Sequence, residues 1–201
     1  MARRSYRLKQ RADSQQVTRQ RIVDATVELH RTVGPARTTI AAIAARAGVQ
    51  RLTVYRHFPE TRDLFQACGA QFVAEHPVPS LAQWAAFGAP RDQLTSALSE
   101  LYGYYAETRD MRANVERDAP ELPELAEAAS GFARFLHAAA ELLTASWAAP
   151  ESQQRLLRAA VVHALSFSTW RSLVSEGKIS NGEAATLMAD FVASVAGGGL
   201  R

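Results

Sequence analysis

Residues 38–58, TTIAAIAARAGVQRLTVYRHF, constrain the fold of this chain more than any other stretch. In the first half, apolar side chains recur at helical spacing, at Ile40, Ile43, Ala44 and Ala47. Thr39 precedes them and is expected to cap the helix, because its hydroxyl can accept a hydrogen bond from a free amide of the first turn. Gly48 follows them and is expected to end the helix, since glycine adopts a left-handed backbone without steric cost.

The second half predicts another short helix at residues 50–57. Leu52, Tyr55 and Phe58 have a helical spacing distinct from its polar side. The polar side carries amide, hydroxyl, guanidinium and imidazole groups, on Gln50, Arg51, Thr53, Arg56 and His57. A short polar helix joined to a supporting helix by a glycine turn is the helix-turn-helix arrangement of DNA-binding proteins.

The run I-A-x-x-A-G-V-x-x-x-T-V-Y-R-H-F-P, at residues 43–59, resembles the DNA-binding signature of the tetracycline-repressor (TetR) family. The likeness covers roughly residues 17–75, and beyond them only the length and the helical character fit. Leu52 departs from the family pattern, standing where glycine or another small residue is common. Thr61, beside Arg62, stands where a lysine is common. The resemblance implies a DNA-binding head, a linking helix, and a body that binds a small effector and forms a dimer.

Side-chain chemistry suggests how the second short helix would read DNA. Arg51 can form a bidentate pair with guanine, and Gln50 can do the same with adenine. Thr53, Tyr55 and His57 suit phosphate oxygens, and the resemblance assigns the Tyr and the His to backbone contacts. Core packing remains an alternative for Tyr55, as does capping of its own helix for His57. The candidate DNA-contacting residues are Thr39, Gln50, Arg51, Thr53, Tyr55, Arg56, His57 and Arg62.

Charge is divided unevenly along the chain. The net charge is only +3, but residues 1–57 hold twelve Lys and Arg against three acids, a net +9. The rest of the chain therefore carries −6. A basic first part followed by an acidic remainder indicates that one end binds a polyanion, and double-stranded operator DNA is the expected partner.

The sequence predicts an all-α fold of about nine helices in three parts. Residues 1–16 are expected to be a basic flexible arm that either neutralises phosphates or is a solvated tail. Residues 17–75 are expected to form a three-helix DNA-binding head with its linking helix, and residues 76–201 an antiparallel helical effector-binding and dimerisation body. The expected helices beyond residue 58 are 61–75, 91–108, 109–119, 124–148, 151–176 and 183–196, with a loose connection around Trp84.

Two of the body helices predict a homodimer. The helix at 151–176 is apolar over a wide arc, so it is expected to be covered on more than one side. The last helix carries a matching stripe, and two such helices from each subunit would form a four-helix interface, as the resemblance also implies. The candidate interface residues are Leu157, Val161, Ala164, Leu165, Ser168, Leu187, Met188, Phe191 and Val195.

The body also contains an aromatic set that could line an effector pocket between helices. The candidate effector-binding residues are Tyr102, Tyr105, Phe135, His163, Phe167 and Trp170. Such a lining would favour a hydrophobic or aromatic effector, and ordinary core packing is the alternative for each of these side chains.

Other classes of protein find little support in the sequence. The five histidines are scattered and Cys68 is the single cysteine, so neither a catalytic site nor a metal or cofactor site is expected. No apolar run is long enough to span a membrane, and one cysteine fits a reducing cytoplasm. The remaining alternatives to a repressor are a transcriptional activator and a helical dimerisation or scaffold protein that does not bind an operator.

Overall fold

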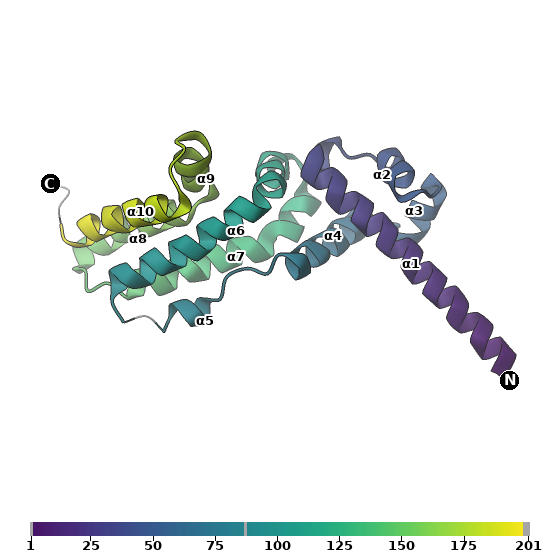
Figure 1. Ribbon diagram of the computed structural model, residues 1–201, viewed down its shortest axis with the longest axis horizontal. Coiled ribbons are helices and arrows are strands. Elements are labelled where there is room, and N and C mark those ends of the chain that lie inside the picture. The colour runs from purple at the N-terminus through teal and green to yellow at the C-terminus, as the bar shows by residue number, and fades with distance from the viewer. Residues whose placement is uncertain (1, 87, 199–201) are drawn as a thin grey trace. The chain divides into compact units, whose positions relative to one another are not determined.

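The computed structural model describes residues 2–86 and 88–198, with side chains at residue 10 and from residue 12 onward. Within these residues the regular structure is entirely helical, as the sequence predicts. Contacts divide the chain into two compact units. The first, here called the head, comprises residues 1–76 and 110–129, and the second, the body, comprises 77–109 and 130–201. Figure 1 labels the helices of both units.

Among the described residues, the head contains four helices, the end of a fifth and the start of a sixth. These are α1 (Ala2–Thr32), α2 (Ile40–Ala47), α3 (Arg51–His57), α4 (Thr61–Glu75), residues 110–118 of α6 (Pro90–Asp118) and residues 123–129 of α7 (Pro123–Ala145), with the short turns η1 (Pro35–Arg37) and η2 (Ala119–Glu121). The predicted bounds of α2, α3 and α4 are confirmed within a residue. Helix α1 corrects the prediction, because it begins at Ala2 rather than near Val17. Residues 2–16 contain no proline or glycine and are rich in good helix formers, so nothing in the sequence stops the helix there.

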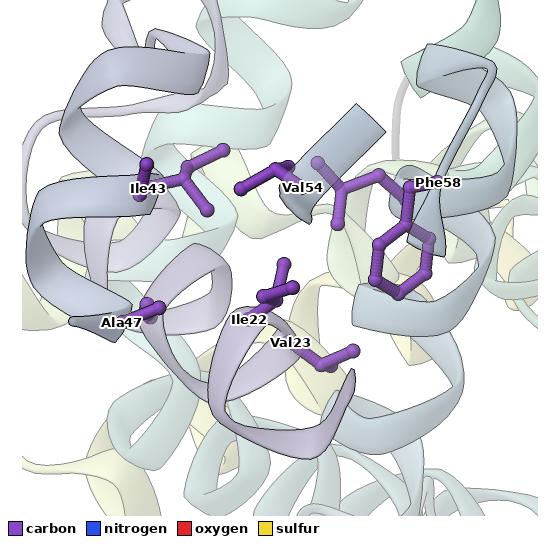
Figure 2. Close-up of a cluster of buried hydrophobic side chains, with 9 residues drawn as sticks. Ile22, Val23, Ile43, Ala47, Val54 and Phe58 are labelled. Carbon is purple, nitrogen blue, oxygen red and sulfur yellow. The ribbon is translucent and has the colours of Figure 1, made fainter. Parts of the chain in front are cut away.

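The head is built around a small apolar core, shown in Figure 2. Ile22 and Val23 of α1 meet Ile43 and Ala47 of α2, together with Val54 and Phe58 at the second helix of the turn. The same core also includes Ala25, Ala44 and Leu64.

The side of α3 that enters this core differs from the predicted one. Val54 is fully buried, whereas Leu52 is 76% exposed and Tyr55 is 52% exposed. The alternative in which Tyr55 packs in the core is therefore wrong. A two-turn helix packed on other helices buries few of its side chains. The spacing of its apolar residues does not show which of them is buried.

The last turns of α6 hold the end of α1 and the following turn. The Asn114 side-chain amide donates to the carbonyls of His30 and Arg31, each at 2.9 Å. The Asp118 carboxylate accepts from the Ala36 amide at 3.0 Å and from Arg117. These contacts satisfy backbone groups that the end of α1 and the turn after it leave without helical partners.

The body contains α5 (Leu81–Trp84), residues 90–109 of α6, most of α7 (Pro123–Ala145), α8 (Glu151–Leu165), α9 (Phe167–Trp170), the π-helical η3 (Arg171–Glu176) and α10 (Asn181–Ala196). In Figure 1, α8 and α10 run side by side, and they pack against each other. The connection expected to be loose contains α5, whose Trp84 is buried and donates to Glu100.

Two predicted helix boundaries in the body are wrong. The helices expected at 91–108 and 109–119 are the single helix α6, because no proline or glycine interrupts residues 104–118. The helix expected at 151–176 is broken at Ser166, whose backbone is extended (φ −73°, ψ 143°) and whose hydroxyl accepts from the Thr169 amide. Serine competes in this way with the helical hydrogen bonds of its own backbone.

The break after α8 frees backbone carbonyls, and two tyrosines of α6 satisfy them. The Tyr102 hydroxyl donates to the Ala164 carbonyl at 2.8 Å, and the Tyr105 hydroxyl donates to the Leu165 carbonyl at 2.7 Å. Both tyrosines are fully buried. Their hydroxyls therefore hold the broken helix against α6, as buried polar groups require hydrogen-bond partners.

Candidate DNA-binding site

The helix-turn-helix is fixed by its two caps and by an arginine of α1. The Thr39 hydroxyl accepts from the Ala42 amide at 3.1 Å, and Gly48 adopts a left-handed backbone (φ 63°, ψ 42°), as the sequence predicts. A Cβ atom at Gly48 would lie 2.7 Å from the Arg21 guanidinium, which donates to the Ala47 carbonyl. The left-handed backbone angle is what favours glycine in the turn, because the Arg21 guanidinium lies at the end of a flexible side chain that can shift.

This turn presents α3 to solvent with its polar groups outward. Gln50, Arg51 and Arg56 are exposed, while Thr53 and His57 are half-buried. Tyr55 lies on the exposed side with them, and Val54 anchors the opposite side in the core. A short helix exposed along its polar side has the geometry of a recognition helix for the major groove.

Three arginines of the head also have structural partners that the sequence pattern does not reveal. The Arg19 guanidinium lies over the Phe58 ring, 4.6 Å from its centroid, at the end of α3. Arg46 of α2 pairs with Glu28 of α1. Arg62 at the start of α4 forms an ion pair of 3.2 Å with Glu127. These contacts tie α1 to the two helices of the motif, and place one acid beside a candidate phosphate contact.

Burial and neighbouring charges change the protonation of His57 at the end of α3. Partial burial, with the nearby charges of Arg56 and Arg19, lowers the pKa of His57. The imidazole is therefore neutral at pH 7 and acts as a hydrogen-bond donor rather than as a fixed charge. The positive charge at this site comes from the arginines.

The six candidate effector-binding residues do not share one environment. Tyr105 contacts Phe167 edge-on at 5.3 Å between centroids, and Phe167 stacks on Trp170 at 5.3 Å. Tyr102 lies 6.4 Å from Tyr105 and belongs to the same buried cluster. Four of the six are therefore brought together as packed core.

The other two candidates lie apart from that cluster. Phe135 is half-buried, with its ring centroid 5.8 Å from that of Trp84. His163 is exposed on α8, beside the hydroxyl of Thr169. The break at Ser166 changes the register between α8 and α9, so His163 does not lie on the same side as the buried Phe167 and Trp170.

The candidate interface residues divide by burial. Leu157, Val161, Ala164 and Leu165, with Met188 and Val195, are buried within the chain itself. Ser168, Leu187 and Phe191 are exposed. These six side chains pack in the chain's own core, and the interface itself stays a prediction. The remaining exposed apolar side chains of α8 are Leu156 and Val162.

Neither a metal site nor a membrane span is found in the described part of the chain. Its His, Cys, Asp and Glu side chains form no group of three or more that could hold a metal ion. Its helices all lack the combination of length and apolar character that crossing a bilayer requires.

Comparison with known proteins agrees with this geometry. Residues 22–68 match the family described as bacterial regulatory proteins, tetR family. The structure of a TetR-like transcriptional regulator from Rhodococcus sp. RHA1 is 26% identical, with a TM-score of 0.62, and the match covers 91% of this chain and 95% of that one. Curated protein sequences gave no match.

Two further solved structures share the fold at lower identity. A tetR-family transcriptional regulator from Streptomyces coelicolor is 19% identical, with a TM-score of 0.61, over 89% of this chain and 79% of that one. NalD of Pseudomonas aeruginosa, the secondary repressor of the MexAB-OprM multidrug efflux pump, is 20% identical, with a TM-score of 0.57, over 92% of this chain and 97% of that one.

A helix-turn-helix with an exposed polar second helix, carried by an all-helical chain, defines a DNA-binding transcriptional regulator. The match over residues 22–68 and the shared fold make the chain similar to the TetR family of transcriptional regulators.

Proposed function

We propose that this protein is a ligand-responsive repressor that binds operator DNA as a homodimer in the cytoplasm. The observation that carries the proposal is the α3 helix, which turns amide, guanidinium and phenol groups to solvent while Val54 and Phe58 fix it from beneath. The net charge of +9 in residues 1–57 supplies the attraction to a polyanion.

The exposed side chains divide into two roles. Arg51 and Gln50 stand at the start of α3 and would read base edges, because guanidinium and amide groups pair with guanine and adenine. Thr53, Tyr55, Arg56 and His57 would contact phosphates, as would Thr39 and Arg62 at the starts of α2 and α4. The Arg62 contact requires that the arginine leave or share its ion pair with Glu127.

A gel-shift titration tests these roles. Arg51→Ala should weaken binding to the operator by about 1–3 kcal/mol and reduce the preference over a mismatched site. Tyr55→Phe keeps the ring and removes only the hydroxyl, so it should weaken both DNAs equally. Leu52→Ala, an exposed apolar change on the same helix, is the matched control. Equal effects of the first two variants on both DNAs would overturn the division of roles.

The exposed apolar residues of α8 and α10 support the homodimer. Leu187 and Phe191 are 51% and 39% exposed and lie one turn apart on α10, and Leu156 and Val162 lie on the exposed side of α8. Two such helices from each of two copies would bury these side chains in a four-helix interface. A dimer would offer two α3 helices to half-sites separated by about one turn of DNA or more.

The proposed response to a ligand is a change in the spacing of the two heads. An effector bound by the body would shift α4, the helix that links the helix-turn-helix to the body, and would favour a dimer that no longer fits the operator. Operator binding measured with and without the native effector tests this step. Undiminished binding at saturating effector would show that the protein is not a ligand-released repressor.

A further inference from the structure

The fold brings an acidic segment into the basic head. Residues 1–57 carry a net charge of +9, but the head also contains residues 110–129, from the end of α6 to the start of α7. That segment holds six acids and two arginines, a net charge of −4. The two kinds of charge are separate in the sequence and belong to one unit in the folded chain. An acid of this segment can therefore compete with DNA for a cation of the head.

The acids of this segment make different contacts. The Asp118 carboxylate accepts a hydrogen bond from the Ala36 amide and so supports the turn after α1. Glu127 forms an ion pair with Arg62, with 3.2 Å between its Oε2 and the arginine Nε. Arg62 is one of the residues that would contact a DNA phosphate, so Glu127 engages a group that DNA would use.

The position of Arg62 is fixed by the core of the head. Arg62 is the second residue of α4, and it stands between Phe58 and Leu64, which both belong to that core. Phe58 is also the C-cap residue of α3. The backbone at Arg62 is therefore held close to the end of the recognition helix, and its exposed side chain is the part that can exchange one anionic partner for another.

The position of Glu127 is fixed by the packing of α7 on α4. Glu127 follows the buried Leu125 on α7. Beside it, a Cβ atom added at Gly69 of α4 would lie 4.0 Å from the Ala128 carbonyl oxygen, which is ordinary van der Waals contact. The two helices thus approach each other closely next to the ion pair, and this packing holds the carboxylate within reach of the guanidinium.

The ion pair is weak enough for DNA to break. Both side chains are 53% exposed, and ion pairs at such exposure contribute little because water competes with them. A phosphate accepts stronger, bidentate hydrogen bonds from a guanidinium. DNA can therefore displace the carboxylate, but the free energy of the phosphate contact is reduced by that of the broken ion pair.

We propose that Glu127 competes with operator DNA for Arg62, so that the first turns of α7 limit the affinity of the head for DNA. This competition rests on the proposed function, because it concerns the same DNA-binding surface. It adds a residue from residues 76–201, which the sequence placed in the body and the fold places, at residues 110–129, in the head.

Glu127→Gln tests the competition because it keeps the size of the side chain and removes its charge. We expect about two- to fivefold tighter binding for each half-site, and so about four- to twenty-fivefold for a dimer on both half-sites. Fluorescence anisotropy at about 0.1 M salt measures the affinity on a duplex that the unchanged protein selects from a random library. The melting temperature should stay within about 3 °C, so a change in folding does not explain the gain.

Two further variants separate competition from net charge. Glu121→Gln removes an exposed acid of the same acidic segment that does not pair with Arg62, and it should change the affinity by less than about twofold. The second is Arg62→Gln, which removes the group for which carboxylate and phosphate compete. In that background, Glu127→Gln should have no larger effect than Glu121→Gln, because the coupling between the two sites is lost.

Each other outcome overturns the proposal in a recognisable way. Equal gains from Glu127→Gln and Glu121→Gln would assign the effect to net charge. Weaker binding by Glu127→Gln would show that the carboxylate orients Arg62 for DNA instead of competing for it. Unchanged affinity, in a protein that binds its selected duplex, would refute the competition and leave the proposed function intact. If the unchanged protein selects no duplex, the proposed function fails, and the competition fails with it.

Discussion

His30 should make the stability of the folded protein fall as the pH drops below about 6.5. The side chain is 4% exposed, lies against Phe65 and has its Nδ1 3.4 Å from the Cys68 sulfur. Burial lowers the pKa of His30 from 6.5 to about 4, and the charge of Asp118 opposes this only in part. Burial also raises the pKa of the Cys68 thiol to about 12, so the thiol keeps its proton and can donate it to the neutral imidazole.

The sign and the size of the effect follow from these two values. Between pH 6.5 and 4 the unfolded chain binds a proton at His30 and the folded chain does not, so acidification favours the unfolded chain. The full difference corresponds to about 3 kcal/mol, of which about 2 kcal/mol is lost between pH 7.5 and pH 5.0. Above pH 6.5 the contribution of His30 to the pH dependence vanishes.

Urea unfolding at a fixed protein concentration and at several pH values from 7.5 to 5.0 measures this dependence. His30→Gln and His30→Phe both remove the titrating group, and they differ in how they fill its space. Each should lose about 2 kcal/mol of the pH dependence between these limits, whatever its stability at pH 7.5. His137→Gln, which removes an exposed histidine of α7, should keep it.

If the two His30 variants and the unchanged protein lose stability in parallel on acidification, the buried imidazole is not the group responsible. A slope retained by only one of the two variants would instead point to a packing change specific to the other.

Three further predictions concern the core, the α6 contact and the dimer. Val54→Ala should lower the free energy of unfolding by about 2 kcal/mol, because it leaves a cavity beneath α3, whereas Leu52→Ala should change it by less than about 0.5 kcal/mol; urea unfolding compares the two. Asp118→Ala should cost about 1–3 kcal/mol in the same assay, since the Ala36 amide loses its acceptor. Phe191→Glu should convert a dimer into a monomer in analytical ultracentrifugation, and an unchanged sedimentation coefficient would exclude this face as the interface.

The sequence was sufficient where local chemistry fixes the backbone. The Thr39 cap and the left-handed Gly48 follow from what a hydroxyl and a missing Cβ can do within one turn, and the structure confirms both. The helical class follows from the spacing of apolar residues along the whole chain. The uneven distribution of charge is likewise a property of the sequence, and it pointed to a polyanionic partner before any fold was known.

Tertiary structure decided which side of each helix is buried and where long helices break. Val54 rather than Leu52 enters the head core because the position of α3 on α1 and α2 selects one side of a two-turn helix. The tyrosines of α6 looked like ligand contacts, but a helix break sixty residues away supplies the carbonyls that they satisfy. Burial and hydrogen-bond partners depend on which segments, distant in the sequence, are in contact in the folded chain. Residue spacing and composition do not show these contacts directly.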